Sequence, residues 1–112
     1  MSHKIEVAGS YGSTQALKDT LRDAGYDFRE GKEGNDTFLV VPKLTAYGNE
    51  ARIYTSGETA RCTVDYIHTA KVQEIYRDSM ARYVKQRLLV DGHSITNETR
   101  QGQNIVLRVA VG

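Results

Sequence analysis

The chain has few of the residues that cross-link, kink or anchor proteins. It contains one cysteine, Cys62, one proline, Pro42, and no tryptophan. A single cysteine excludes a disulfide framework within the chain and is typical of a reducing compartment. No stretch approaches the roughly 20 apolar residues that span a bilayer. Residues 1–8 also lack the apolar segment of a signal peptide, so we expect a cytoplasmic protein with no membrane partner.

The chain also lacks a clear excess of either charge. Lysine and arginine number 15 against 14 aspartate and glutamate, which gives a formal net charge of +1. Proteins that bind duplex nucleic acid through its phosphates usually carry a clear basic excess. The composition therefore disfavours duplex binding by bulk charge and leaves a local basic patch open.

The residues that are present predict one folded domain over 1–112. Hydrophobic residues make up 39% of the 112 positions and charged residues 26%, both ordinary for a globular protein. A chain of this length can bury a core without disulfides or a metal.

An amphipathic pattern predicts a first helix over about 14–24. Leu17, Leu21 and Ala24 recur on one side, with polar residues between them. Ser13 or Thr14 offers an N-cap oxygen. A glycine follows the last helical residue, where a left-handed residue commonly ends a helix.

A second and longer helix is predicted over about 70–90, with Thr69 as its N-cap and Asp91-Gly92 at its end. Apolar residues recur at steps of three and four and share one face: Val72, Ile75, Tyr76, Met80, Tyr83, Val84 and Leu88. Such a face is expected to pack on the core.

Short apolar or alternating runs predict the strands. These runs lie at 3–8, 26–28, 37–41, 51–55, 61–66, 93–98 and 104–111. Polar, glycine-containing turns are predicted at 30–36, 56–59 and 100–103, and an irregular connection at 43–49.

The two halves of the chain, about 3–42 and 50–112, follow a similar pattern. In each, a helix ends at a glycine, a polar hairpin turn follows, and an apolar strand returns: LRDAG leads to TFLVV, and LLVDG leads to NIVLRV. We therefore predict an α+β fold of two βαββ-like halves, in which two helices pack on one face of an antiparallel or mixed sheet. Chance or convergence on a common motif is the alternative explanation of the repeat.

Several of these positions resemble the domain-of-unknown-function 1257 family, which includes a conserved hypothetical reading frame of plastids and cyanobacteria. Members tend to begin MSH, as at 1–3, and to end a first helix before a glycine and an aromatic, as in Asp23-Ala24-Gly25-Tyr26. A QRYA-like stretch in a long helix corresponds to Ala81-Arg82-Tyr83-Val84. The chain departs from the pattern at its end, where Val109-Ala110-Val111 replaces an arginine-tryptophan ending.

The resemblance covers most of the chain thinly, and a remote phage or bacterial relative would fit it. The family has no established activity. The resemblance therefore implies a fold and an accessory role, and it carries over no catalytic residue.

Few residues predict chemistry. His68 follows Asp65 and Tyr66 just before the long helix, where a histidine beside a carboxylate can act as a general base. A polar strand-to-helix junction explains the same residues and is favoured. Cys62 alternates with Val64 and is expected to be a buried, inert thiol. The three histidines and one cysteine show no metal-ligand spacing, so we expect no metal and no cofactor.

The strongest binding surface predicted is the face of the sheet opposite the helices. Arg52 and Tyr54 alternate out of one expected strand, Arg61 out of the next, and Arg108 out of the last. Arginine and tyrosine are enriched at interface hot spots and also stack on single-stranded bases. A solvated outer face is the alternative.

Three functions follow from these residues. The first is a non-enzymatic accessory protein that binds another protein or associates with itself. The second is a binder of small nucleotides or single-stranded nucleic acid through the Arg/Tyr face. The third is a small hydrolase or transferase with His68 as its base. We favour the first, because the chain shows no catalytic constellation.

Overall fold

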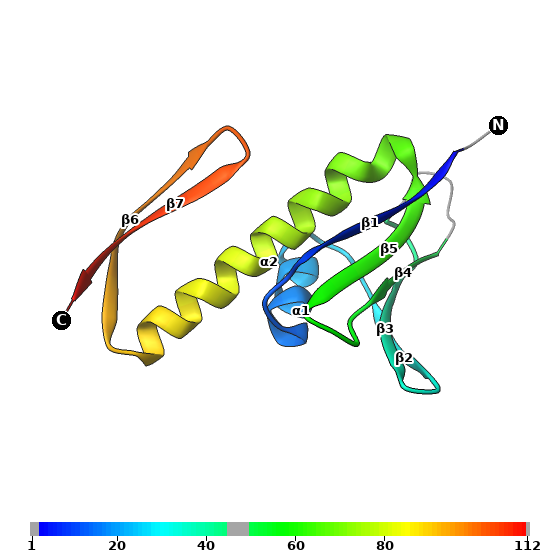
Figure 1. Cartoon of the computed structure of the whole chain (residues 1–112), viewed down its shortest axis with the longest axis horizontal. Helices are drawn as coiled ribbons and strands as arrows, with labels where there is room; N and C mark the ends of the chain where they lie inside the picture. Colours follow the sequence, from blue (N-terminus) through cyan, green and yellow to red (C-terminus); the bar gives the residue numbers. More distant parts are fainter. Residues whose placement is uncertain (1–2, 45–49, 112) are drawn as a thin grey trace.

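The computed structural model of the protein describes residues 3–44 and 50–111 and shows two sheets and two α-helices (Figure 1). In chain order the elements are β1 Lys4–Ser10, α1 Thr14–Asp23, β2 Arg29–Glu33, β3 Asp36–Val41, β4 Ala51–Tyr54, β5 Thr59–Asp65, the 3₁₀ turn η1 Tyr66–His68, α2 Thr69–Val90, β6 His93–Gln101 and β7 Asn104–Val111. Most of the expected connection 43–49 lies outside the described residues. The predicted α+β class is confirmed.

Five strands form the main sheet in the order β1-β5-β4-β3-β2, and every neighbouring pair is antiparallel. Because cross-strand partners share a face, one row of side chains runs through four strands as Val7, Cys62, Ile53 and Leu39. All four are buried, and they define the inner face of the sheet.

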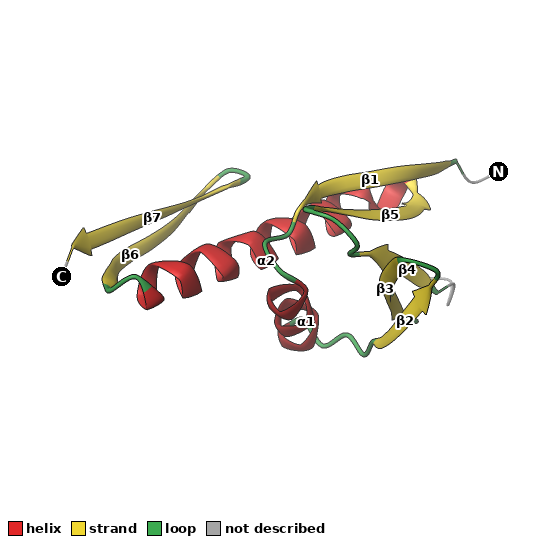
Figure 2. Ribbon diagram, turned by 60° about the horizontal axis from the view of Figure 1, so that its bottom comes forward, coloured by secondary structure: helices red, strands yellow, loops and turns green. Residues whose placement is uncertain are grey.

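Both helices pack on this inner face, as predicted. Figure 2 shows the sheet curving from β1 to β2 around the side on which α1 and α2 lie. Leu17 and Leu21 of α1 and Val72 of α2 join the inner strand residues in one hydrophobic cluster. None of the helices in the described part of the chain has the length and apolar character needed to cross a bilayer.

Local signals fix the ends of α1. Ser13 is its N-cap, and its Oγ accepts a hydrogen bond from the backbone N–H of Ala16 at 3.1 Å. At the other end Gly25 has φ of +85°, and the N–H of Tyr26 donates to the carbonyl of Leu21 at 2.9 Å. This is the glycine-terminated geometry that the sequence predicts.

The long helix α2 begins one residue earlier than predicted. Its N-cap is His68, whose side chain makes no capping hydrogen bond, so the expected role of Thr69 as N-cap is wrong. The 3₁₀ turn η1 leads directly into the helix, and the carbonyl of Tyr66 accepts a hydrogen bond from the backbone N–H of Thr69. The expected end at Asp91-Gly92 is confirmed, with Gly92 at φ of +85°.

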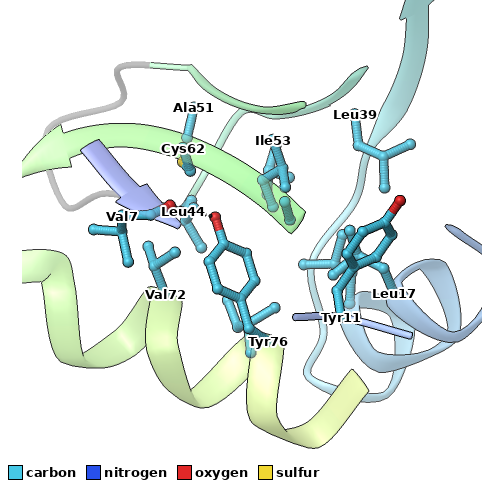
Figure 3. Packing of buried hydrophobic residues seen from close by; sticks show 14 of the residues in the cluster. Val7, Tyr11, Leu17, Leu39, Leu44, Ala51, Ile53, Cys62, Val72 and Tyr76 are labelled. Carbon is cyan, nitrogen blue, oxygen red and sulfur yellow. Dashed lines mark hydrogen bonds between the residues drawn. The ribbon is translucent and has the colours of Figure 1, made fainter. Parts of the chain in front are cut away.

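Two tyrosines hold the sheet to the helices (Figure 3). The hydroxyl of Tyr76 donates to the carbonyl of Val7 at 2.9 Å. The hydroxyl of Tyr11 lies 3.0 Å from the carbonyl oxygen of Thr55 and 2.8 Å from that of Gly57. The Oγ of Ser79 donates to the carbonyl of Tyr11. These bonds join β1, the β4–β5 turn and α2 inside the core.

The last two strands form a separate sheet that pairs only β6 with β7 among the described residues. This hairpin lies along the C-terminal half of α2 and extends away from the main sheet (Figure 1). The radius of gyration is 15.1 Å, against about 13 Å expected for a compact chain of this length. The extended hairpin accounts for the difference.

One strand prediction was wrong, and so was part of one turn prediction. Residues 26–28 form no strand, and β2 instead occupies Arg29–Glu33, within and beside the predicted turn 30–36. The sequence of β2 is REGKE, which has no apolar pattern, and its pairing with the apolar β3 makes it a strand. The order strand-helix-strand-strand does occur in both halves, but the second hairpin leaves the main sheet. The internal repeat stays a prediction.

Candidate binding face of the five-stranded sheet

The outer face of the main sheet, opposite the helices, carries a continuous row of side chains. Registers between neighbouring strands place Ala8 of β1 beside Arg61 of β5, Arg61 beside Tyr54 of β4, Tyr54 beside Phe38 of β3, and Phe38 beside Gly31 of β2. The structure therefore brings Tyr54 and Arg61 together on one face, as the sequence predicts. The same face also carries Phe38 of β3, which lies between Tyr54 of β4 and Gly31 of β2.

Guanidinium groups cover both aromatic rings of this row. The rings of Phe38 and Tyr54 are tilted by 57° with centroids 5.4 Å apart. The guanidinium carbon of Arg52 lies 4.7 Å from the centre of the Phe38 ring, and that of Arg61 lies 5.5 Å from the centre of the Tyr54 ring. We call Arg52, Phe38, Tyr54 and Arg61 the Arg/aromatic row. Each cation–π contact contributes about 0.5–1 kcal/mol at an exposed site.

Phe38 is buried although it lies on the outer face. Its side chain is 8% exposed, because the ring lies over Gly31 and beneath Arg52. A Cβ built on Gly31 would lie 2.2 Å from Cε2 of Phe38. The Phe38 ring thus occupies the space that a side chain at position 31 would need. This packing holds the ring in place beneath the other side chains of the row.

Replacing Gly31 by alanine is expected to lower the free energy of unfolding by about 1–3 kcal/mol, because overpacking forces the Phe38 ring out of its position. Urea denaturation followed by circular dichroism measures the change. Gly57→Ala is the matched control, since a Cβ there meets no atom within 4 Å. It should change stability by less than about 0.5 kcal/mol. Equal effects at both positions would show that the ring does not occupy this space.

Carboxylates balance part of the positive charge on the outer face. Arg29 makes two contacts with the carboxylate of Glu50, at 2.9 and 3.0 Å. Arg52 lies 3.6 Å from Glu33. Within residues 3–44 and 50–111, no carboxylate pairs with Arg61 in this way. Arg61 is therefore the arginine of the Arg/aromatic row that is available to an outside partner.

The two other predicted site residues lie elsewhere. Arg108 is on β7, in the separate hairpin, so the prediction that it shares a face with Arg52 and Arg61 is wrong. The error came from assigning β7 to the main sheet. His68 is 7% exposed at the start of α2, and its Nε2 has no hydrogen-bond partner in the described part of the chain.

The structure also shows a cleft that the sequence did not predict. It has a volume of about 640 Å³ and lies between the end of α1, the middle of α2 and the hairpin. Three ion pairs hold its walls together: Arg82 with Asp23, Arg100 with Asp78 at 2.5 Å, and Lys85 with Glu98 at 2.6 Å. Six of the eight charged side chains that line the cleft are thus engaged with one another, and the remaining two are Lys71 and Glu74. His68 does not line it.

A second, smaller hollow of about 430 Å³ lies between the start of α1 and the β2–β3 hairpin. Gly31 and Phe38 contribute to its wall, together with Thr14 and Thr55. It adjoins the Arg/aromatic row at the edge of the sheet. His68 does not line this hollow either, so neither cavity offers a substrate site next to the proposed general base.

Cys62 is buried on the inner face, at 2% exposed, as the sequence predicts. Burial raises the pKa of its thiol from its ordinary value of 9.0 to about 11. The nucleophilic thiolate is therefore negligible near neutral pH, and Cys62 serves as a small core residue.

The raised thiol pKa predicts a loss of stability in alkali. Between pH 9 and 11 the unfolded chain releases the Cys62 proton while the folded chain retains it, so rising pH favours unfolding. The slope is at most about 1.4 kcal/mol per pH unit. Burial also raises the pKa of Tyr76 and acts in the same direction at higher pH.

Urea titrations of wild type and Cys62→Ala should diverge above pH 9, where the free energy of unfolding should fall less steeply with pH in the variant. Parallel curves would contradict the assignment.

Phe38 and Gly31 are the site residues that sequence reasoning missed. The signal was present in the run TFLVV, where apolar residues occupy successive positions. Such a run indicates a strand buried on both faces, and therefore an aromatic on the outer face as well.

Comparison with known proteins gives no assignment. No protein-family model matches the chain, and no curated protein or solved structure matches it.

Proposed function

We propose that the chain is a non-enzymatic accessory protein that binds another protein through the outer face of its five-stranded sheet. The Arg/aromatic row is the observation that carries the proposal. Arginine and tyrosine dominate the energy of protein interfaces, and here both project from neighbouring central strands.

The rigidity of the row supports this function. Phe38 is fixed between Gly31 and Arg52, and Tyr54 packs against it. Each arginine side chain lies over a ring, which limits the conformations it can adopt. Groups that are ordered before association lose less entropy when the partner arrives, so more of their contact energy appears as affinity.

The charge of the row indicates what the partner presents. Arg61 has no carboxylate partner among the described residues, whereas Arg52 and Arg29 are already paired. A carboxylate placed over Arg61 would accept charge-assisted hydrogen bonds from the guanidinium. The proposed partner therefore offers an aspartate or glutamate beside apolar or aromatic side chains that cover Tyr54.

A second candidate function uses the same face to bind single-stranded nucleic acid or a nucleotide. The contact of Arg61 with Tyr54 favours it, since both groups stack on bases. Two observations favour a protein instead. Phe38 is buried and offers no free ring face, and Glu33 and Glu50 place negative charge on the same surface. Those carboxylates neutralise Arg29 and Arg52, which leaves little positive charge on this surface for a phosphate backbone.

Site-directed photo-crosslinking tests the proposal. A benzophenone amino acid replaces Thr63, which is exposed on β5 two residues from Arg61 and therefore on the same face. The control carries the same group at Arg87, near the end of α2. Illumination in an extract of the source cells should join one protein to position 63 and not to position 87. The same protein crosslinked at both positions, or at neither, would overturn the proposal.

Fluorescence anisotropy decides between the two candidate functions. Labelled single-stranded oligonucleotides and a nucleotide panel are titrated with the protein at low salt, where phosphate contacts are strongest. We expect no saturable binding. Saturable binding that is lost in Arg61→Ala and retained in Arg87→Ala would establish the second candidate in place of the first.

A further inference from the structure

The two sheets have four edge strands, and three of them carry features that prevent pairing with another chain. β2 has the sequence REGKE, with four charged residues in five. β1 carries Lys4 and Glu6. β6 contains a bulge, because Thr96 is an extra residue between the pairs at Ile95 and Asn97. Charges and bulges of this kind protect natural sheet edges.

The fourth edge, β7, has no such protection. Its sequence is NIVLRVAV, with one charge at Arg108, no proline and no bulge of its own. Its only strand partner in the described structure is β6, so its other side presents unpaired backbone groups. A long, apolar and regular edge is the kind that pairs with a further strand.

One face of the hairpin is apolar and only partly covered. Glu98 and Arg100 of β6 form ion pairs with α2, so their side of the hairpin faces that helix. Their cross-strand partners Leu107 and Ile105 share this side, as does Val109. Val109 remains 40% exposed, and Ile105 and Leu107 are only half-buried.

The exposed apolar side chains concentrate in this part of the molecule. Seven large hydrophobic residues are exposed in the described structure, and four belong to the end of α2 or to β7: Leu89, Val90, Val106 and Val109. A two-stranded hairpin alone is marginally stable in water and needs further strands or packing against a helix, which α2 supplies here only in part. In a single copy of the chain, the apolar side chains of this region are therefore only partly covered.

We propose that β7 pairs with β7 of a second copy, antiparallel about a two-fold axis perpendicular to the hairpin. The result is a four-stranded sheet in which the two β7 strands are central and the two β6 strands are the protected edges. Two-fold dimers are the commonest oligomers, and their interfaces join one surface to itself. The α2 helices of both copies then lie on the same face of the joined sheet. This interface is separate from the Arg/aromatic row.

The sequence of β7 selects the register of this pairing. A two-fold axis perpendicular to the sheet places the side chains that face α2 in one copy opposite side chains that face α2 in the other. The two residue numbers of each opposed pair are therefore both odd or both even. Full overlap of 104–110 then places Leu107 opposite Leu107 of the second copy. It also places Ile105 opposite Val109, and Val106 opposite Arg108. The two apolar faces merge, and the two Arg108 side chains avoid a directly opposed position.

A second copy fits this edge better than an unrelated chain does. β7 is complementary to an antiparallel copy of itself. Each apolar residue that faces α2 lies opposite another apolar residue, and Arg108, the only charged residue of the strand, lies opposite Val106. The edge strands of the main sheet, β1 and β2, are charged and match an apolar strand poorly.

Paired substitutions at Val106 test the proposal by analytical ultracentrifugation of the full chain. Val106 is 38% exposed and opposes Arg108 of the second copy. Val106→Arg places two arginines opposite each other and should weaken the dimer at least tenfold. Val106→Glu places a carboxylate there and should leave the dimer as tight as wild type or tighter. A monomeric wild type, or equal effects of both substitutions, would overturn the proposal.

Cysteine cross-linking tests the register. Cys62 is buried, so under mild oxidation we expect cross-links to form only through a second, introduced cysteine. Leu107→Cys lies on the axis, opposite itself, and should give a disulfide-linked dimer, because directly opposed strand residues have Cα atoms within disulfide range. In Val109→Cys the two thiols are separated by four residue steps, or about 14 Å, and no cross-link is expected. Cross-linking at 109 and not at 107, or no cross-link at 107, would overturn the proposed pairing.

Discussion

Replacing Tyr76 by alanine is expected to lower the free energy of unfolding by about 3–5 kcal/mol, the range for large aromatic truncations in cores. Tyr76 is 3% exposed, and its ring packs against Gly9 of β1. Its hydroxyl donates to the carbonyl of Val7 at 2.9 Å. The substitution therefore leaves a cavity between α2 and β1 and also an unpaired buried carbonyl. Stabilities of whole domains are about 5–15 kcal/mol, so this substitution should remove a large share of the stability of the fold.

Two control variants separate the contributions of the Tyr76 ring and hydroxyl. Tyr76→Phe keeps the ring and removes only the hydrogen bond to Val7, so a loss of about 1–3 kcal/mol is expected. Tyr66→Ala removes an aromatic that is 60% exposed and should change stability by less than about 0.5 kcal/mol. Urea titrations measure all three. If the alanine variants at 76 and 66 unfolded at the same urea concentration, α2 would not be packed on β1 as described.

Replacing Arg61 and Tyr54 together by alanine is expected to weaken binding of the crosslinked partner at least 100-fold. Hot-spot residues contribute about 2 kcal/mol or more each, and 100-fold corresponds to about 2.7 kcal/mol. The two residues form one unit, since the guanidinium of Arg61 lies over the Tyr54 ring. The single substitutions should therefore not add up to the effect of the pair. Surface plasmon resonance with the purified partner measures all of these affinities.

The matched control for this pair is Arg87→Ala with Tyr66→Ala. It removes the same residue types from exposed positions outside the five-stranded sheet. Affinity should then stay within about twofold of wild type. Thermal unfolding of both double variants confirms that each is folded at the assay temperature. Equal losses of affinity in the two double variants would place the partner on another surface.

Much of the fold could be predicted because local signals specify it. The Ser13 cap, the glycines at positions 25 and 92, and the apolar stripe of α2 each depend on residues close together in sequence. These signals placed both helices correctly to within a residue or two. The apolar run at 37–41 likewise gave β3.

The strand pairings could not be predicted in the same way. β2 is polar throughout and is a strand only because β3 offers hydrogen-bonding partners. β7 is apolar and alternating, which fits the main sheet as well as a separate hairpin. Its position depends on the ion pairs of β6 with α2, between residues about 13 to 22 positions apart. Arg108 was placed on the wrong sheet for this reason.

The candidate site was predicted in part. Alternation along β4 and β5 was enough to place Arg52, Tyr54 and Arg61 on one face. The platform beneath them depends on a contact between Phe38 and a glycine on the neighbouring strand, and the register that creates it is not visible in either segment alone.

Nuclear magnetic resonance of the protein with its crosslinked partner tests the central claim, that the outer face of the sheet is the binding surface. The side-chain Nε–Hε signals of Arg52 and Arg61 and the ring signals of Tyr54 report directly on the Arg/aromatic row. We expect these signals to shift on binding and those of Arg87 and Arg108 to stay unchanged. Shifts confined to Arg87 and Arg108 would place the partner on α2 or the hairpin and would contradict the account.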